Sequence, residues 1–598
     1  MSQNQVNAKT EVAKVAKTEV NSPTTKTIFS SSTIFDNKES KANRKTTSKL
    51  DAKTESKTEV KAESNANTKT TTKKGDYFNE QGTAQLEQIK SMYNVGITYF
   101  PFFLVAGMAV VIGGKVAYKK LTTKTSTSHG SAHFASRREI KHLLRPMNEP
   151  IRQGELRVGK YIETWRPKHK YVSLPRNIVN RHVLIVGPSG AGKSRALFLP
   201  NCYYNKGTSF LATDPKSELW EQTSGLQECP IRFAPMEPEN SLAFNPIPAC
   251  RDIDIAERLA IAIVYARGEE GDPFYYLTQQ QLLKALIAHV AHSSVPTLTH
   301  VYELISLGGF AVIPILQESP NESARRMSTS FVGLNEKLLT GAVQAITGKL
   351  SWLENPKLRR FTSSVDYTFD FAELRRRPIQ AYWCLNEDDV TKIMELTAAF
   401  FNMAMVALKR AEDKKVSVNF YFDEFGNIGR LTNFENDITL IRSRDLAVIG
   451  CLQNIAQLEK IYGRVNAQII WANFNTKFVL NGLENATGEM ISKTLGDYTY
   501  LEEKLSTSRA GFFAKGTTES ESAHARKLLT PDELRTYSSK KMILISTELP
   551  AISLDRLRYE DRPNNIAKLD CCPNEITIPS YEAVKAEMKA QQSRQKRR

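Results

Sequence analysis

The sequence lacks the closely spaced cysteine pairs that indicate a disulfide-bonded protein or a zinc protein. Its seven cysteines are scattered, and none belongs to a Cys-x-x-Cys pair. The vicinal pair Cys571 and Cys572 is interpreted as incidental thiols. This distribution is typical of a reducing compartment and gives no disulfide framework. Histidine is sparse too: His289 and His292 lie one helical turn apart in an apolar stretch, where packing is favoured over metal ligation.

The body of the chain also lacks a strong charge of one sign. The formal net charge is +17, but residues 1–75 carry +7 and residues 585–598 carry +5. The two tails therefore hold 12 of the 17 charges. Because the remainder is spread over the body, total charge gives little support for nucleic-acid binding by the folded part.

The two ends of the chain have compositions unlike the body. Residues 1–75 are rich in Lys, Thr, Ser, Asn and Glu and have almost no large apolar side chains. Such a segment buries too little apolar surface to offset its chain entropy, so we predict a disordered tail. Residues 561–598 are predicted to form a basic C-terminal tail.

Long hydrophobic runs are absent except for one, from Val95 to Gly114, which contains no charged residue. At 1.5 Å per residue a helix of this length spans about 30 Å, which is the thickness of a bilayer core. We predict a transmembrane segment within 90–120, and the alternative is a buried core helix. Lysines follow the run at once, so the positive-inside rule places the C-terminal side in the cytoplasm.

Downstream of residue 150 the chain alternates short apolar β-prone runs with helical stretches. This alternation is typical of a parallel sheet covered on both faces, in an α/β domain made of 125–251 and 351–560. Between them, 252–350 shows helical apolar spacing and predicts an inserted all-α domain. The predicted strands are Val183–Val186, Ser209–Ala212, Ala381–Leu385, Val418–Phe422, Ala447–Leu452 and Phe478–Leu480.

A phosphate-binding loop follows the first of these strands. The segment fits G-x-x-x-x-G-K-[ST] in full and leads into a helical stretch. Its glycines let successive N–H groups point at phosphate oxygens, next to a helix N-terminus. Lys193 would bridge the β- and γ-phosphates, and Ser194 would ligate Mg²⁺. The predicted nucleotide-binding residues are Gly187, Pro188, Ser189, Gly190, Ala191, Gly192, Lys193 and Ser194.

A P-loop needs an acidic partner at the end of another buried strand. Asp423 and Glu424 follow the apolar run Val418–Phe422. We predict that Asp423 holds the Mg²⁺ shell and that Glu424 polarises the attacking water. Asp388 and Asp389 also follow a strand, but a solvated turn is the favoured interpretation for them.

Other polar residues are predicted at the same edge of the sheet. Gln453 ends the strand Ala447–Leu452, so it could sense the γ-phosphate; the alternative is a helix cap or a solvent-facing amide. Asp214, Lys216 and Glu218 are either ligand contacts or residues of a charged surface loop. One of Arg430, Arg442 and Arg444 could be an arginine finger for a neighbouring subunit, and the alternative for each is a surface salt bridge.

Seven segments together resemble the coupling proteins of type IV secretion and conjugation, the TraG/TraD-type ATPases, from about His129 to Pro550. They follow one another in the family's order. Two depart from the usual pattern, with His133 in place of Arg and Ser217 in place of Gly. The segments are His129–Ala135, Thr213–Leu219, Phe244–Ile247, Asp272–Tyr275, Asp423–Gly426, Gln453–Leu458 with Tyr462-Gly463, and Arg526–Leu534.

The resemblance implies a RecA-like P-loop NTPase domain with an inserted all-α domain that receives substrate. It implies ATP and Mg²⁺ as cofactors and a homo-hexamer at the cell inner membrane, with the ATPase domain in the cytoplasm. The implied partners are relaxase-bound or single-stranded DNA, the relaxosome and the secretion channel. Family members commonly have two membrane helices, whereas this chain shows one span.

Three alternatives remain open at this point. The same motor could deliver effector proteins, or it could be a chromosome-type DNA translocase. A membrane-anchored scaffold that binds nucleotide only to assemble is the third, and the water-activating Glu424 argues against it.

Overall fold

The computed structural model describes residues 102, 104–114 and 127–557, except 147–148, 150, 164–165, 204, 206, 269–271, 365–368 and 510–514. The predicted tails at 1–75 and 561–598, and the pair Cys571-Cys572, lie outside the described residues. The chain divides into two compact units, Met1–Gly113 and Gly114–Arg598.

Of the predicted membrane segment 90–120, only residues 102 and 104–114 are described, and they are helical. Their large apolar side chains are exposed, among them Val105 and Val110. Within the described part of the chain, no helix has both the length and the apolar character needed to cross a membrane.

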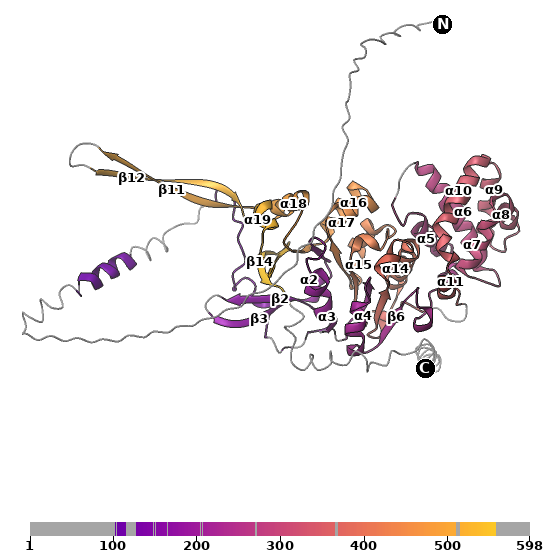
Figure 1. Cartoon of the computed structure of the whole chain (residues 1–598), viewed down its shortest axis with the longest axis horizontal. Coiled ribbons are helices and arrows are strands. Elements are labelled where there is room, and N and C mark those ends of the chain that lie inside the picture. The colour runs from indigo at the N-terminus through magenta and orange to yellow at the C-terminus, as the bar shows by residue number, and fades with distance from the viewer. Residues whose placement is uncertain are drawn as a thin grey trace, which may run out of the picture. The chain divides into compact units, whose positions relative to one another are not determined.

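A twelve-stranded mixed sheet runs through the described part of the larger unit (Figure 1). Seven neighbouring strands are parallel, as the alternation of strands and helices predicted. In order across the sheet they are β10 (Thr476–Val479), β4 (Val183–Val186), β9 (Leu446–Leu452), β8 (Val418–Phe422), β5 (Ser209–Asp214), β7 (Gln380–Cys384) and β6 (Pro230–Phe233).

Five antiparallel strands extend the sheet beyond β10, and the expectation of an all-parallel sheet is wrong for them. Most of them mix polar and apolar residues and therefore lack the continuous apolar runs that mark central parallel strands, whereas the strand at Lys541–Ser546 has such a run at Met542–Ile545. In order from β10 they are β13 (Lys541–Ser546), β14 (Leu549–Asp555), β2 (Leu156–Glu163), β3 (Arg166–Leu174) and β1 (Leu144–Arg145).

Side chains of each central strand alternate between two hydrophobic cores, one on each face of the sheet. In β4, Leu184 and Val186 belong to one core, whereas Val183 and Ile185 belong to the other. The first core is covered by α14 (Met394–Arg410), α15 (Phe434–Arg442), α16 (Ala456–Tyr462), α17 (Arg464–Asn473), α18 (Asn485–Leu495) and α19 (Pro531–Arg535). The second is covered by α2 (Arg176–Val179), η2 (Ser194–Phe198), α3 (Leu199–Tyr203) and α4 (Glu218–Thr223).

The short helices complete the connections. They are η1 (Lys141–Leu143), η3 (Ser224–Leu226), η4 (Pro238–Asn240), η5 (Ile247–Arg251), η6 (Ser351–Glu354), α12 (Glu373–Arg376), α13 (Glu387–Val390) and η7 (Phe425–Asn427).

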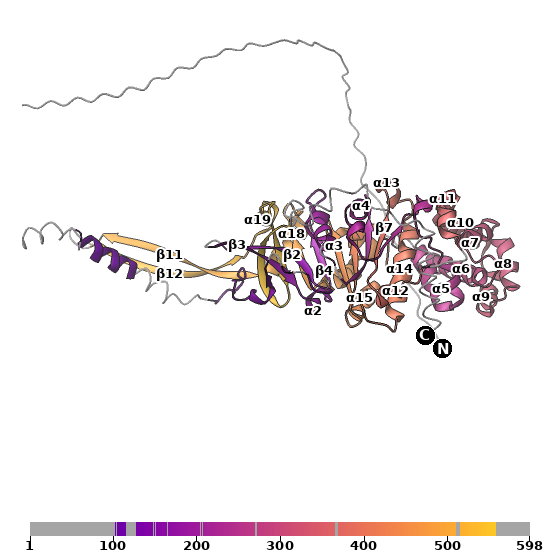
Figure 2. The ribbon, with the colours of Figure 1, turned by 90° about the horizontal axis from the view of Figure 1, so that it is seen from below.

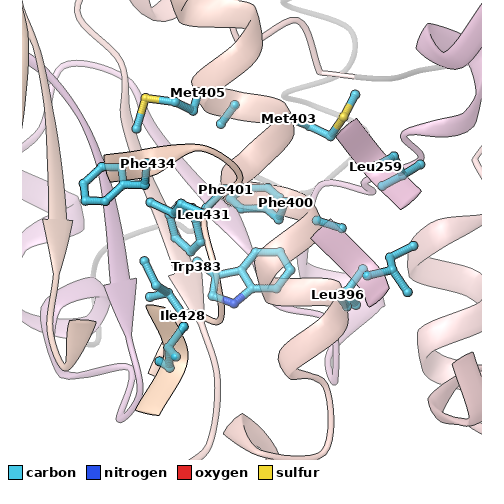
Figure 3. Close-up of a cluster of buried hydrophobic side chains, with 14 of the residues drawn as sticks. Leu259, Trp383, Leu396, Phe400, Phe401, Met403, Met405, Ile428, Leu431 and Phe434 are labelled. Atoms are coloured by element: carbon cyan, nitrogen blue, oxygen red, sulfur yellow. The ribbon is translucent and has the colours of Figure 1, made fainter. Parts of the chain in front are cut away.

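Trp383 of β7 lies in the first core, close to residues that follow β8 and the acidic pair Asp423-Glu424 (Figure 3). Its ring stacks on Phe400 of α14 with 4.2 Å between centroids. Its indole Nε1 donates to Thr397 Oγ1 at 3.3 Å. Ile428 and Leu431, which follow β8, pack into the same cluster. The core therefore fixes the chain directly after the acidic pair.

A group of helices interrupts the α/β domain after η5, and it gathers at the end of the sheet that holds β6 and β7 (Figures 1 and 2). Several helices begin at an Asp, Asn or Thr whose side chain accepts from a backbone N–H of the first turn, as Asp252 and Asn321 do. The helical structure continues past residue 350. The helices are α5 (Ile253–Val264), α6 (Pro273–Ala291), α7 (Leu298–Ser306), α8 (Gly309–Gln317), α9 (Glu322–Val332), α10 (Glu336–Leu350) and α11 (Pro356–Thr362).

A separate two-stranded ribbon, β11 (Asp497–Arg509) paired with β12 (Lys515–Lys527), leaves the body after α18. Its base is bound to the segment near His129, because Ala132 N donates to Asp497 O at 3.0 Å. Gly130 is required there: its φ is +142°, and a Cβ would lie 2.1 Å from Asp497 O.

Candidate nucleotide-binding site

The phosphate loop lies at the carboxyl end of β4, between the ends of β10 and β9. Gly187 N donates to Leu452 O at 3.1 Å, which fixes the start of the loop against β9. Gly190 and Gly192 have φ values of +74° and +79°, a left-handed conformation that glycine adopts without strain. These two glycines curl the backbone of residues 187–193 into a cradle, and the π-helix η2 follows.

Lys193 fills the cradle with its own side chain. Its Nζ donates to the carbonyl oxygens of Gly187 and Pro188, both at 3.1 Å, and the residue is buried. The ammonium group is thus bound to carbonyl oxygens of the P-loop itself. A phosphate entering the cradle offers it a stronger, charged acceptor.

Ser194 and Asp423 meet across the site. Ser194 Oγ donates to Asp423 Oδ2 at 2.5 Å. Asp423 follows β8, and its backbone N donates to Thr213 Oγ1 of the neighbouring β5 at 2.8 Å. Burial raises the pKa of Asp423 to about 6, against the lowering effect of the Ser194 hydrogen bond. A hydroxyl and a carboxylate so close together fit a hard oxygen-seeking cation such as Mg²⁺.

Glu424 is held by two side-chain amides. Gln453 Nε2 donates to its Oε1 at 2.9 Å, and Asn427 Nδ2 donates to its Oε2 at 2.5 Å. Gln453 is fixed in turn, because Gln457 Oε1 accepts from its backbone N at 2.9 Å. Glu424 has a φ of +67°, which is unusual for a residue with a side chain. Such strain is concentrated at functional sites.

A cavity of about 510 Å³ opens beside the P-loop. It is lined by Lys193, Ser194, Asp423 and Glu424. The predicted catalytic and metal-binding residues of the P-loop and the acidic strand therefore share one space, with Gln453 behind Glu424.

The carboxyl end of β5, which is Asp214, and the turn that follows it form another wall of this cavity. Asp214 is buried there, and burial raises its pKa to about 7. Its Oδ2 accepts from Trp220 N at 2.8 Å. Lys216 pairs with Glu387 at 2.8 Å, and both line the cavity.

The predicted surface residues have mixed outcomes. Asp388 is exposed, as expected of a solvated turn, but Asp389 is largely buried and paired with Lys392 at 3.0 Å. Neither lines the cavity.

The three candidate arginines lie outside the cavity lining. Arg444 Nη1 donates to Lys409 O at 2.5 Å, and Arg442 is exposed at the end of α15. Arg430 is half-buried, and its guanidinium lies over the rings of Tyr265 and Tyr462 at 5.8 and 6.0 Å. Arg430 therefore packs against two aromatic rings, and its role stays a prediction.

Three residues of the site were not predicted from the sequence. Thr213 begins one recognised segment and Asn427 directly follows another, and the parallel pairing of β5 with β8 is the signal that could have identified the role of Thr213. Arg556 carries no such signal, although its Nη1 donates to the P-loop oxygen Ala191 O at 2.8 Å.

A family model described as "Type IV secretory system Conjugative DNA transfer" matches residues 128–597. "Protein VirD4" of Agrobacterium fabrum is 25% identical over 477 residues, which cover 76% of this chain and 70% of that protein. "Protein VirD4" of Rhizobium rhizogenes is 25% identical over 485 residues, covering 76% and 69%.

Solved structures of the plasmid coupling protein TrwB share the fold. TrwBdeltaN70 in an unbound form has a TM-score of 0.57 at 18% identity and covers 73% of this chain and 97% of its own. TrwB in complex with ADP and Mg²⁺ has a TM-score of 0.55 at 16% identity, with coverages of 72% and 95%. On the family match, which spans most of its length, the chain belongs to the type IV secretory system conjugative DNA transfer family, the type IV coupling proteins.

Proposed function

We propose that this chain is an ATP-hydrolysing coupling protein that recruits relaxase-bound DNA and drives its delivery to a type IV secretion channel. One observation carries the ATPase part. The Ser194–Asp423 and Glu424–Gln453 hydrogen bonds bring a cation site and a candidate general base to the edge of a complete P-loop. A protein that only binds nucleotide has no need of the second pair.

The roles of the side chains follow from their positions. Backbone N–H groups of the loop hold the phosphates, and Nζ of Lys193 exchanges its carbonyl acceptors for β- and γ-phosphate oxygens. Ser194 and Asp423 would hold Mg²⁺, which would neutralise phosphate charge when it is bound. Glu424 takes a proton from a water molecule as the water oxygen attacks the γ-phosphorus. The bond between the γ-phosphorus and the bridging oxygen breaks, and ADP leaves.

Gln453 links this chemistry to movement. Its amide donates to Glu424, and its backbone N is held by Gln457 of α16. A γ-phosphate that attracts the Gln453 amide would therefore pull on both Glu424 and α16. This supports the role of Gln453 as a sensor of the γ-phosphate.

The family description, conjugative DNA transfer, favours DNA over effector proteins as cargo. We propose single-stranded or relaxase-bound DNA, the relaxosome and the secretion channel proteins as partners. The working form is a homo-hexamer at the inner membrane, with the ATPase domain in the cytoplasm. The exposed apolar helix at residues 104–114 supports a membrane anchor within 90–120.

ATP hydrolysis by the full-length protein in detergent, with and without DNA, tests the proposal. We expect DNA to stimulate hydrolysis, the stimulation to fall with salt, and Lys193→Ala to abolish hydrolysis. Hydrolysis without any response to single- or double-stranded DNA would contradict DNA as cargo. Co-purification from donor cells then separates the cargo classes, since recovery of a relaxase supports DNA delivery and recovery of unrelated effectors supports protein delivery.

A further inference from the structure

The outer wall of the P-loop is built by the chain that follows β10. Leu480 N donates to Val186 O at 2.9 Å, so this chain runs beside the start of the loop. Contact is close on both sides: a Cβ on Gly187 would lie 2.8 Å from Leu480 Cβ, and a Cβ on Gly482 would lie 3.0 Å from Pro188 Cγ. Asn481 stands between these two contacts.

Arg556, directly after β14, joins this wall to the loop. Its Nη1 donates to Ala191 O at 2.8 Å, and its Nη2 donates to Asn481 Oδ1 at 2.7 Å. Its Nε donates to Lys541 O of β13 at 2.9 Å. All three guanidinium nitrogens therefore have acceptors, and they lie on three different segments. The residue is half-buried, and burial lowers its pKa.

The Ala191 carbonyl is a sensitive place for such a contact. The C=O of Ala191 and the N–H of Gly192 are the two ends of one peptide unit, which lies between the left-handed residues Gly190 and Gly192. A donor that holds the oxygen end fixes the direction of the N–H end. A cation at the oxygen also polarises the peptide and makes its N–H a stronger donor to an anion.

We propose that Arg556 is a positioning residue for phosphate binding, which aims the peptide between Ala191 and Gly192 at the β-phosphate and adds positive charge behind the loop. This inference rests on the proposed nucleotide-binding function. It also gives the antiparallel strands a role in the site, because β13 and β14 are what bring Arg556 to the loop.

The test compares Arg556→Gln with Arg556→Lys in the full-length protein, by titration of ADP, ATP and AMP and by steady-state hydrolysis. We expect Arg556→Gln to weaken ADP and ATP binding about tenfold, the size of one lost charge-assisted hydrogen bond. AMP has no β-phosphate, so its binding should not change. KM should rise with kcat within about twofold, and Arg556→Lys, which keeps the charge, should recover part of the affinity.

Arg181→Gln is the matched control, because Arg181 pairs with Glu548 in the turn between β13 and β14 without contacting the P-loop. It should leave ADP affinity unchanged. If Arg556→Gln lowers the melting temperature more than this control does, Asn481→Ala replaces it, with an expected loss of about threefold in ADP affinity.

Unchanged ADP affinity in Arg556→Gln or Asn481→Ala overturns the inference, and so does an equal loss of AMP and ADP. If the unsubstituted protein binds no nucleotide, the proposed function itself fails. If the unsubstituted protein binds nucleotide but the Arg556 and Asn481 variants keep the ADP affinity of the Arg181→Gln control, the proposed function stands and only the role of Arg556 is wrong.

Discussion

Gln453 and Glu424 are joined by a hydrogen bond of 2.9 Å between Nε2 and Oε1, across the ends of the neighbouring strands β9 and β8. Because the two strands are parallel, residues that follow them meet at one edge of the sheet. The same edge holds the P-loop. Strand order thus brings Glu424, the proposed general base, next to the amide of Gln453.

Glu424→Gln should separate nucleotide binding from hydrolysis. The amide keeps the size of the side chain but cannot accept the proton of the attacking water. We expect kcat to fall by about 10²- to 10⁴-fold, with ADP affinity within about twofold of the unsubstituted protein. Single-turnover kinetics measure the rate of hydrolysis, and a nucleotide titration measures the ADP affinity. Full hydrolysis in this variant would remove Glu424 from the chemistry, whereas full loss of binding would assign it a structural role.

Asn427→Ala tests whether a fixed carboxylate is needed. Its Nδ2 holds Glu424 Oε2, so removal of the amide leaves one of the two oxygens without this donor. We expect kcat to fall about tenfold at nearly constant KM, because misplacement of a catalytic group costs rate more than binding. Gln468→Ala, an exposed position on α17, is the control. A rise in hydrolysis instead would show that the amide restrains Glu424.

Gly187→Ala should damage the P-loop through packing. The new Cβ would lie 2.8 Å from Leu480 Cβ, so the loop and the β10 end must move apart. Overpacking of this kind costs about 1–3 kcal/mol. We expect lower thermal stability together with weaker ADP binding. Gly450→Ala in β9 is the matched control, since its Cβ would meet its nearest neighbour at 3.6 Å, an ordinary contact. Equal behaviour of the two variants would contradict the steric argument.

His182 should make the stability of the fold depend on pH. Its Nε2 donates to Ile438 O at 2.7 Å, and its Nδ1 accepts from Val448 N at 3.1 Å, so the ring is bound in its neutral form. Burial lowers its pKa from 6.5 to about 4. The unfolded chain then takes up a proton at a higher pH than the folded chain. Stability is therefore present above pH 6.5 and is lost as the pH falls from about 6.5 to about 4.

We expect the free energy of unfolding to drop by about 2 kcal/mol from this residue between pH 7.5 and pH 5. His182→Asn should be less stable at pH 7.5, because it loses these ring contacts, and should show a smaller drop. Asparagine is suited to the φ of +63° at this position. An equal pH dependence in both proteins would exclude His182 as the cause. Urea unfolding at the two pH values makes the measurement.

The P-loop, the pair Asp423-Glu424 and Gln453 could all be located from the order of residues in the chain. Each stands directly after an apolar run, and the physics of a parallel sheet brings the ends of such runs to one edge. Helical spacing likewise predicted helices between residues 252 and 350, where α5 to α10 lie. These segments could be located from the sequence because periodicity and strand–loop–helix order are local properties of the chain, while the roles of the site residues stay predictions.

The other residues of the site are brought together by folding and could not be located from the sequence. Arg556 is 365 residues from Ala191, and it recognises a backbone oxygen, which leaves no trace in the side-chain pattern. Thr213 contacts Asp423 only because β5 and β8 are neighbours in the sheet. Asn427 contacts Glu424 only in the folded turn, where Glu424 takes a left-handed conformation. The attachment of the antiparallel strands to the sheet was missed for the same reason, because β13 pairs with β10 and β14 pairs with β2, which are distant in the chain. The ribbon β11–β12 pairs strands that are neighbours in the chain, and it too was not predicted from the sequence. Contacts with backbone atoms and pairings between remote strands are properties of the folded chain, so the fold alone specifies them.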